Sequence, residues 1–234
     1  MLAVDQDLPP VDATMTFAAS AGVWASSILA ASSRKESTKS LYAMLTRVHL
    51  TPAPFGTLTL AAIKPRQIDQ LIMRLREERS LSESSTRTVY TVVRSILDGA
   101  QRDGLIAVNP AEKVPRPTVS RREARHLPVA DVRALLEAAS TSRYHRAFTL
   151  IAQTGLRRGE TLGLAWSDIE IDKNIMHVRT ILGRVNGNLI RTAPKLENSR
   201  RDIVLTQATV ALFREQRIAQ LEEHMKAANQ WEDS

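Results

Sequence analysis

The sequence contains no cysteine, and only 4% of its residues are aromatic. The lack of cysteine excludes disulfide cross-links and thiolate metal sites, and it is typical of a reducing compartment, so we expect a cytoplasmic protein. Five histidines alone are weak grounds for a metal site, and we expect neither a metal ion nor a small-molecule cofactor. The shortage of aromatic side chains leaves little to stack on the bases of single-stranded nucleic acid.

The sequence also lacks a hydrophobic run suited to a membrane span. Residues 13–33 carry no charge, but Ser, Thr and Gly interrupt them and acidic residues precede them, whereas a secretory signal begins with positive charge. Phe17, Trp24 and Ile28 recur there at helical spacing on one face. We therefore predict an amphipathic helix that packs on its neighbours, and no membrane partner.

Positive charge is what the chain has in excess, with a formal net charge of +7. The excess lies in residues 34–122, where 16 basic and 8 acidic side chains leave a net +8. This concentration favours a polyanionic partner, and with so few aromatic residues we expect double-stranded DNA. An alternative stays open, in which the region is only the solvated surface of a helical interaction protein without a DNA role.

Apolar residues recur at helical spacing four times in the first half of the chain, which predicts a helical bundle. The four runs cover residues 16–31, 37–49, 66–79 and 83–102. Pro65 stands at the start of the third run, where its missing amide proton costs nothing, and Ser82 is a candidate cap for the fourth. Residues 109–124, basic and rich in proline, predict an extended linker. We thus expect a flexible N-terminus over 1–15 and a DNA-binding helical domain over 16–108.

The pattern changes in the second half of the chain. Residues 128–140 and 144–153 have helical spacing, whereas the segments 169–181 and 189–205 are rich in Ile, Val and Thr and flank Asn186-Gly187, a strong hairpin signal. Helical spacing returns over 206–228 through Val210, Leu212, Phe213 and Leu221. We therefore predict a mainly α fold with a small antiparallel β-sheet, whose second domain covers 125–234.

The stretch from Thr154 to Asp168, TGLRRGETLGLAWSD, places an arginine at a glycine-containing turn just before a short helix. It resembles the first conserved box of the tyrosine recombinases, the phage integrase family. The matching residues include Arg157, Glu160, Leu162, Leu164, Trp166, Asp168 and Ile169. Phosphoryl transfer places negative charge on phosphate oxygens, and a planar guanidinium binds two of them with paired hydrogen bonds.

The resemblance implies that Arg157 is the catalytic clamp on the scissile phosphate and that Glu160 steers a neighbouring side chain. Three residues along a helix is a suitable spacing for such steering. The alternative is an ordinary structural Arg–Glu pair, which is common on helices. The same resemblance places Lys195 in a hairpin, where its ammonium would protonate the departing 5′ hydroxyl; alternatively it is an ordinary hairpin-tip lysine.

Several basic residues are candidate contacts with the DNA backbone. Arg87 and Arg94 are seven residues apart, about two helical turns, so they project from one side of the fourth helix. For each of them a solvated charged face is an equally good interpretation. The other candidates are Lys39, Arg116, Arg158, Arg200 and Arg201.

The resemblance covers nearly the whole chain: it implies a helical, SAM-like core-binding domain followed by the first part of an α+β recombinase catalytic domain. The family's HxxR box and nucleophilic tyrosine have no match, because Tyr42, Tyr90 and Tyr144 all precede Arg157. We expect a site-specific recombination protein whose partners are duplex DNA and other recombinase protomers. Covalent catalysis needs the nucleophile, so this chain by itself is expected to bind DNA without cutting it. An alternative is a non-enzymatic protein that occupies recombination sites and modulates an intact recombinase.

Overall fold

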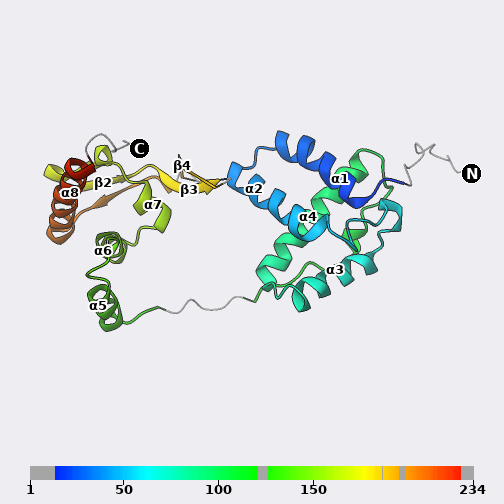
Figure 1. Ribbon diagram of the computed structural model, residues 1–234, viewed down its shortest axis with the longest axis horizontal. Helices are drawn as coiled ribbons and strands as arrows, with labels where there is room; N and C mark the ends of the chain where they lie inside the picture. The colour runs from blue at the N-terminus through cyan, green and yellow to red at the C-terminus, as the bar shows by residue number, and fades with distance from the viewer. Residues whose placement is uncertain (1–13, 121–125, 186, 195–198, 228–234) are drawn as a thin grey trace, which may run out of the picture. The chain divides into compact units, whose positions relative to one another are not determined.

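The computed structural model describes residues 14–120, 126–185, 187–194 and 199–227. The chain divides into two compact units, residues 1–123 and 124–234 (Figure 1). Most of the predicted N-terminal segment 1–15, the end of the predicted linker and the predicted catalytic Lys195 lie outside the described residues. The domain limits drawn from the sequence stay predictions. No helix in the described ranges is long and apolar enough to cross a membrane.

The first unit is a bundle of helices. Its elements are α1 (Phe17–Trp24), extended by a wider π-helical turn over Ala25–Leu29, α2 (Glu36–Leu45), extended likewise over Thr46–Leu50, a 3₁₀ turn at Leu60–Ala62, α3 (Pro65–Glu77) and α4 (Glu83–Arg102). All four predicted helical runs are confirmed, with ends that agree within two residues. Pro65 is the first residue of α3, and the Ser82 hydroxyl accepts a hydrogen bond from the Ser85 amide at 3.2 Å, as an N-cap does.

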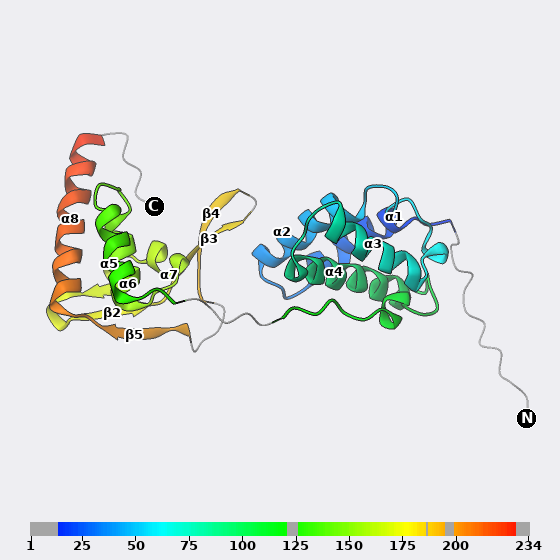
Figure 2. The ribbon, with the colours of Figure 1, turned by 90° about the horizontal axis from the view of Figure 1, so that it is seen from below.

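Helix α4 lies at the centre of this unit, in contact with α1, α2 and α3 (Figure 2). The predicted apolar stripe Val89, Val93, Ile96 and Leu97 is fully buried. Burying these side chains against the other helices is the main favourable contribution to folding this unit. Phe17 is also fully buried, and its ring meets Phe55 edge to face at 4.8 Å.

The structure differs from the expectation of an extended linker over 109–124, because its first part is packed on the bundle. Pro110–Lys113 forms a 3₁₀ turn, and Ala111 and Val114 are buried. The buried hydroxyl of Tyr90 on α4 lies 2.8 Å from the Ala111 carbonyl oxygen and 3.0 Å from that of Val114. The sequence offered no apolar periodicity here, since these contacts come from an irregular segment and from one tyrosine hydroxyl.

The second unit combines four helices with short strands in the part of the chain that is described. In chain order these are α5 (Val129–Ala138), α6 (His145–Thr154), α7 (Arg158–Gly163), a 3₁₀ turn at Trp166–Asp168, β1 (Ile169–Glu170), a second 3₁₀ turn at Ile171–Lys173, β2 (Ile175–Val178), β3 (Ile181–Val185), β4 (Asn188–Thr192), β5 (Arg201–Val204) and α8 (Gln207–Ala227). The predicted mainly α fold with small antiparallel sheets is confirmed.

The strands form two sheets rather than the single sheet that was predicted. Strands β1, β2 and β5 pair antiparallel with β2 in the middle, while β3 and β4 form a separate two-stranded ribbon that projects from them (Figure 2). Val185 pairs with Asn188, which agrees with the predicted two-residue turn, although residue 186 is not described. Between the two sheets, the Thr180 hydroxyl donates a hydrogen bond to the Gly163 carbonyl at 2.5 Å, which ties the connection after β2 to α7.

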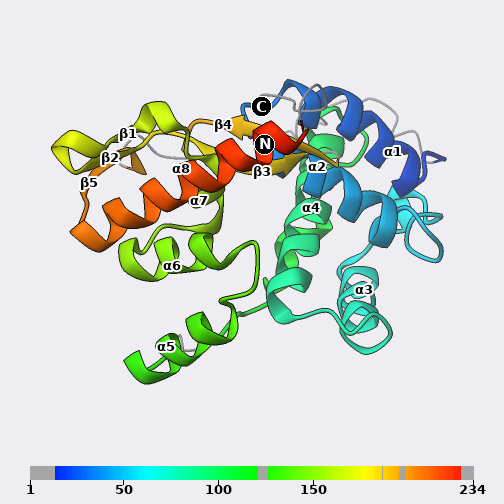
Figure 3. The same ribbon diagram turned by 60° about the vertical axis from the view of Figure 1, so that its left-hand side comes forward.

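The core of the second unit lies between the three-stranded sheet and helices α6 and α8, which run side by side (Figure 3). Met176 and Val178 of β2 are fully buried there, together with Leu150 of α6 and Phe213 of α8. The C-terminal half of α8 contributes nothing to this core: Leu221, predicted to lie on its apolar stripe, is 55% exposed.

Candidate functional site

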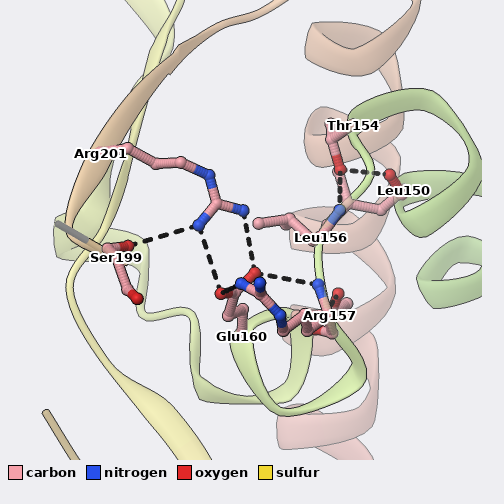
Figure 4. A network of polar contacts seen from close by, with 8 residues as sticks. Leu150, Thr154, Leu156, Arg157, Glu160, Ser199 and Arg201 are labelled. Atoms are coloured by element: carbon pink, nitrogen blue, oxygen red, sulfur yellow. Dashed lines mark hydrogen bonds and ion pairs between the residues drawn. The ribbon is translucent and has the colours of Figure 1, made fainter. Parts of the chain in front are cut away.

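A left-handed turn presents Arg157 at the surface of the second unit. Helix α6 ends at Gly155, whose φ of 67° is open to glycine at no steric cost. The Thr154 hydroxyl donates a hydrogen bond to the Leu150 carbonyl at 2.6 Å and so closes the last turn (Figure 4). Leu156 is buried in the core, and Arg157 follows in extended conformation immediately before α7. The anchored leucine therefore fixes where the arginine leaves the backbone.

Helix α7 is held directly against strand β3 because the residues at the closest approach are glycines. A Cβ atom on Gly163 would lie 2.8 Å from the Leu182 amide nitrogen, closer than real Cβ atoms approach. The Gly163 carbonyl also accepts a hydrogen bond from the Arg191 guanidinium of β4 at 3.0 Å. These interactions position α7, and with it the carboxylate of Glu160.

Glu160 is the hub of the site, with a side chain that is only 3% exposed. Its carboxylate accepts hydrogen bonds from the Arg157 amide and the Arg157 guanidinium, both at 2.9 Å. Arg201 on β5 donates two more, at 3.2 Å to Oε1 and 2.9 Å to Oε2 (Figure 4). The predicted role of Glu160 in steering a neighbouring side chain stays a prediction, and this geometry supports it.

The two guanidiniums keep Glu160 ionised. The paired hydrogen bonds from Arg201, and then those from Arg157, lower the pKa of the Glu160 carboxyl to about 2, against the opposing effect of its burial. The pKa of Arg201 is raised by the same pair. The single carboxylate of Glu160 thus pairs with the guanidiniums of both Arg157 and Arg201, and the three side chains together keep a net positive charge.

Arg157 retains the capacity to bind an anion. Its side chain is 76% exposed, and in the described part of the chain only its Nη1 nitrogen has a side-chain partner. A guanidinium carries five donors in a rigid fork, so most remain for a tetrahedral oxyanion.

Further basic residues lie near this cluster. Arg179, Arg200, Arg201 and Asp202 line an open hollow of about 430 Å³. Arg200 is exposed, as expected for a backbone contact, whereas Arg201 is turned toward Glu160. Arg179 was missed at the sequence level; the signal that could have found it is its place directly after β2, next to the Val178–Arg201 pair of the ladder.

The sheet carries a second polar cluster, formed by one residue from each strand. His177 of β2 lies 2.6 Å from Asp202 of β5 and 2.7 Å from Glu170 of β1. The hydrogen bonds to Asp202, and next those to Glu170, raise the pKa of His177. Asp202 and Arg201 are adjacent on β5, so the strand directs one side chain to His177 and the next to Glu160.

In the first unit, the predicted basic face of α4 gains one member. Arg94 is exposed and Arg87 is half-buried, with Thr91 between them on the helix. Arg116, from the segment after the bundle, places its guanidinium 3.4 Å from the Thr91 hydroxyl. Arg116, distant in sequence, therefore joins Arg87 and Arg94 on one face.

The two remaining candidate DNA contacts, Lys39 and Arg158, differ in whether their charged groups already have partners within the protein. Lys39 donates to the Ala30 carbonyl at 2.8 Å and pairs with Glu36 at 3.0 Å, so its ammonium is already engaged within the first unit. Arg158, the first residue of α7, is exposed.

The chain thus has a helical bundle and an α+β unit, and the second unit exposes the guanidinium of Arg157 beside the buried carboxylate of Glu160. These features fit a protein that binds an anionic group. Residues 125–228 match the model of the phage integrase family. The chain is 26% identical over 212 residues to a XerC-like tyrosine recombinase of Caldanaerobacter subterraneus subsp. tengcongensis, covering 84% of this chain and 54% of that protein. The second unit is thus similar to the phage integrase family, and most of the chain is similar to a tyrosine recombinase.

Two solved structures share the fold. The Tn1549 transposon integrase in complex with a circular intermediate DNA superposes with a TM-score of 0.70 at 20% identity, over 86% of this chain and 64% of that one. A lambda integrase tetramer bound to a Holliday junction gives 0.62 at 20% identity, over 80% and 51%. The chain spans about half the length of the curated relatives it matches.

Proposed function

We propose that this chain acts in site-specific DNA recombination, with the first unit binding duplex DNA and the second unit holding the scissile phosphate. The observation that carries the proposal is the exposed guanidinium of Arg157, fixed at its base by the buried carboxylate of Glu160. A guanidinium held in this way can bind two phosphate oxygens without a large loss of side-chain entropy on binding.

In the proposed reaction each residue has a separate task. Arg157 neutralises the charge that develops on the non-bridging oxygens of the phosphodiester. Lys195 supplies the proton for the departing 5′ oxygen, as the family resemblance implies. Arg200 holds an adjacent phosphate of the same strand. A covalent step also needs a hydroxyl nucleophile within reach of the phosphorus.

None of the three tyrosines is suited to be that nucleophile. Tyr90 is buried in the first unit with its hydroxyl against two backbone carbonyls. Tyr42, on α2, lies with its ring under the guanidinium of Arg34. Tyr144 is exposed just before α6, with Arg143 over its ring. We therefore propose that these 234 residues by themselves bind duplex DNA without forming a covalent link to it.

The first unit is proposed to bind the DNA backbone through the face of α4 that carries Arg87 and Arg94, together with Arg116, whose guanidinium lies against Thr91 on that helix. Because the opposite face of α4 is buried in the bundle, the backbone positions from which Arg87 and Arg94 project are fixed. Contacts of this kind set orientation and affinity rather than base sequence.

Two further features of the proposal rest on the family. The lambda integrase relative forms a tetramer on a Holliday junction, and assembly with other recombinase protomers is proposed for this chain as well. A cytoplasmic location is proposed, since the DNA on which such proteins act lies there.

Salt dependence of duplex binding tests the proposal. The affinity of a fluorescent duplex of about 30 base pairs, measured by anisotropy from about 50 to about 300 mM salt, is expected to fall steeply. The double variant Arg87→Ala plus Arg94→Ala is expected to flatten the log–log slope by about 0.9 for each phosphate that is no longer neutralised. A matched double variant at the exposed Lys64 and Arg66, at the start of α3, controls for charge alone. A duplex affinity that does not change with salt concentration would refute binding to the DNA backbone.

A nicked suicide duplex tests the absence of covalent chemistry. Such a substrate traps any protein–DNA adduct, and we expect none from this chain. A trapped adduct would contradict the assignment of the tyrosines. Retained binding without an adduct would also fit the alternative of a non-enzymatic occupant of recombination sites, and competition against an intact relative on the same duplex would separate the two roles.

A further inference from the structure

Arg201 donates paired hydrogen bonds to the same buried carboxylate that holds Arg157 (Figure 4). Its own side chain is only 34% exposed, and its Nη1 nitrogen also lies 3.3 Å from the Ser199 carbonyl. Both terminal nitrogens are therefore occupied inside the protein. This is a poor arrangement for a direct phosphate contact and a good one for holding Glu160.

The charges explain what Arg201 adds. A carboxylate paired with Arg157 alone would neutralise it and compete with any incoming anion. Two guanidiniums on one carboxylate leave a net charge of +1, and Arg201 donates two of the three guanidinium hydrogen bonds to Glu160. Arg157 is thus oriented by Glu160 without being fully neutralised.

We propose that Arg201 is a positioning residue that acts through Glu160 and keeps the guanidinium of Arg157 available for a phosphate. The inference rests on the proposed function, because it assigns Arg157 to a phosphate. It replaces the expectation from sequence that Arg201 is itself a backbone contact.

The pairing of β5 with β2 positions Arg201 beside Glu160. In the β2–β5 ladder, Arg201 stands opposite Val178 and Asp202 stands opposite His177. A slip of one residue would direct Asp202 toward Glu160 and place two carboxylates together. The His177–Asp202 pair therefore fixes the register on which the position of Arg201 depends.

A double-mutant cycle in duplex binding tests the inference with the whole chain. Arg201→Gln is expected to weaken binding by roughly tenfold, the scale of one charge-assisted hydrogen bond. In the Arg157→Gln background the same change is expected to cost less than about twofold, because the group through which it acts is gone. Arg200→Gln removes the same charge one residue away and is expected to weaken binding equally in both backgrounds. Equal losses for Arg201→Gln in both backgrounds would overturn the inference.

Carboxyl NMR provides a second readout that does not depend on DNA. Arg201→Gln is expected to raise the Glu160 pKa from about 2 toward its ordinary value and to slow hydrogen exchange of the Arg157 Nη1 protons, because Arg157 becomes the only guanidinium partner of Glu160. Arg201→Lys keeps a positive charge and is the variant to use if Arg201→Gln does not fold. Its Glu160 pKa and its Arg157 exchange rate are expected to lie between those of the wild type and of Arg201→Gln. An unchanged Arg157 signal in either variant would refute the positioning role. Absence of duplex binding by the wild-type chain would refute the proposed function instead.

Discussion

Replacing Glu160 with glutamine is the most direct test of how the site is built. The substitution keeps the shape of the side chain and removes its charge, so Arg157 and Arg201 lose their shared counter-ion while still lying against the same buried group. One donor of the new amide would also face the two guanidiniums. The charge therefore matters here more than the packing.

The size of the effect follows from the pKa of this carboxyl, which is lowered from 4.5 to about 2. At about 1.4 kcal/mol per unit, the interactions of the ionised form stabilise the second unit by roughly 3 kcal/mol. Because the folded-state pKa is depressed, this stabilisation is present above the unfolded pKa and is lost as the pH falls from about 4.5 through about 2. The glutamine variant is expected to be less stable at pH 7 by that amount and to lack this part of the acid dependence.

Urea denaturation of protein labelled with 5-fluorotryptophan provides the assay, because Trp166 reports on the second unit and Trp24 on the first. The Trp166 transition is expected to move to lower urea at pH 7, and the Trp24 transition to stay in place. Glu137→Gln, on the exposed surface of α5, is the charge-matched control. If Glu160→Gln shifted the Trp166 transition no more than Glu137→Gln at pH 7, the account of Glu160 as an ionised hub would be wrong.

Three further predictions concern the scaffold. Because the pKa of His177 is raised, its contribution to the sheet is complete below pH 6.5 and is lost as the pH rises through the raised value; the protection factors of the β2 amides, corrected for intrinsic exchange, should fall over that range, and not in His177→Gln. Gly163→Ala is expected to destabilise the second unit by about 1–3 kcal/mol, since the new methyl meets strand backbone, while Gly183→Ala, with nothing within 4 Å, should cost far less in the same urea titration. Tyr90→Phe removes the hydroxyl that contacts the Ala111 and Val114 carbonyls and is expected to lower the stability of the first unit by about 1–3 kcal/mol; an unchanged Trp24 transition would contradict the hydrogen bonds of its hydroxyl.

Some of this architecture could be read directly from the sequence. The limits of α4, the cap at Ser82 and the proline at the start of α3 depend on neighbours within a few residues, and these local preferences agree with the packed helices. Arg157 and Glu160 were found for the same reason, because the turn, the arginine and the carboxylate are contiguous in the chain. A motif of this kind can be recognised without knowing which distant residues pair.

What the sequence could not decide are the interactions between residues far apart along it. The pairing of Arg201 with Glu160 spans 41 residues, and it depends on a strand register that no local pattern specifies. Likewise the sequence predicted one sheet, whereas the strands form two, with Thr180 between them bonded to the distant Gly163 carbonyl. The sequence by itself thus identified Arg157 as the proposed phosphate ligand and Glu160 beside it, and only the tertiary structure decided which second arginine shares that carboxylate, because that choice is made by the pairing of distant strands.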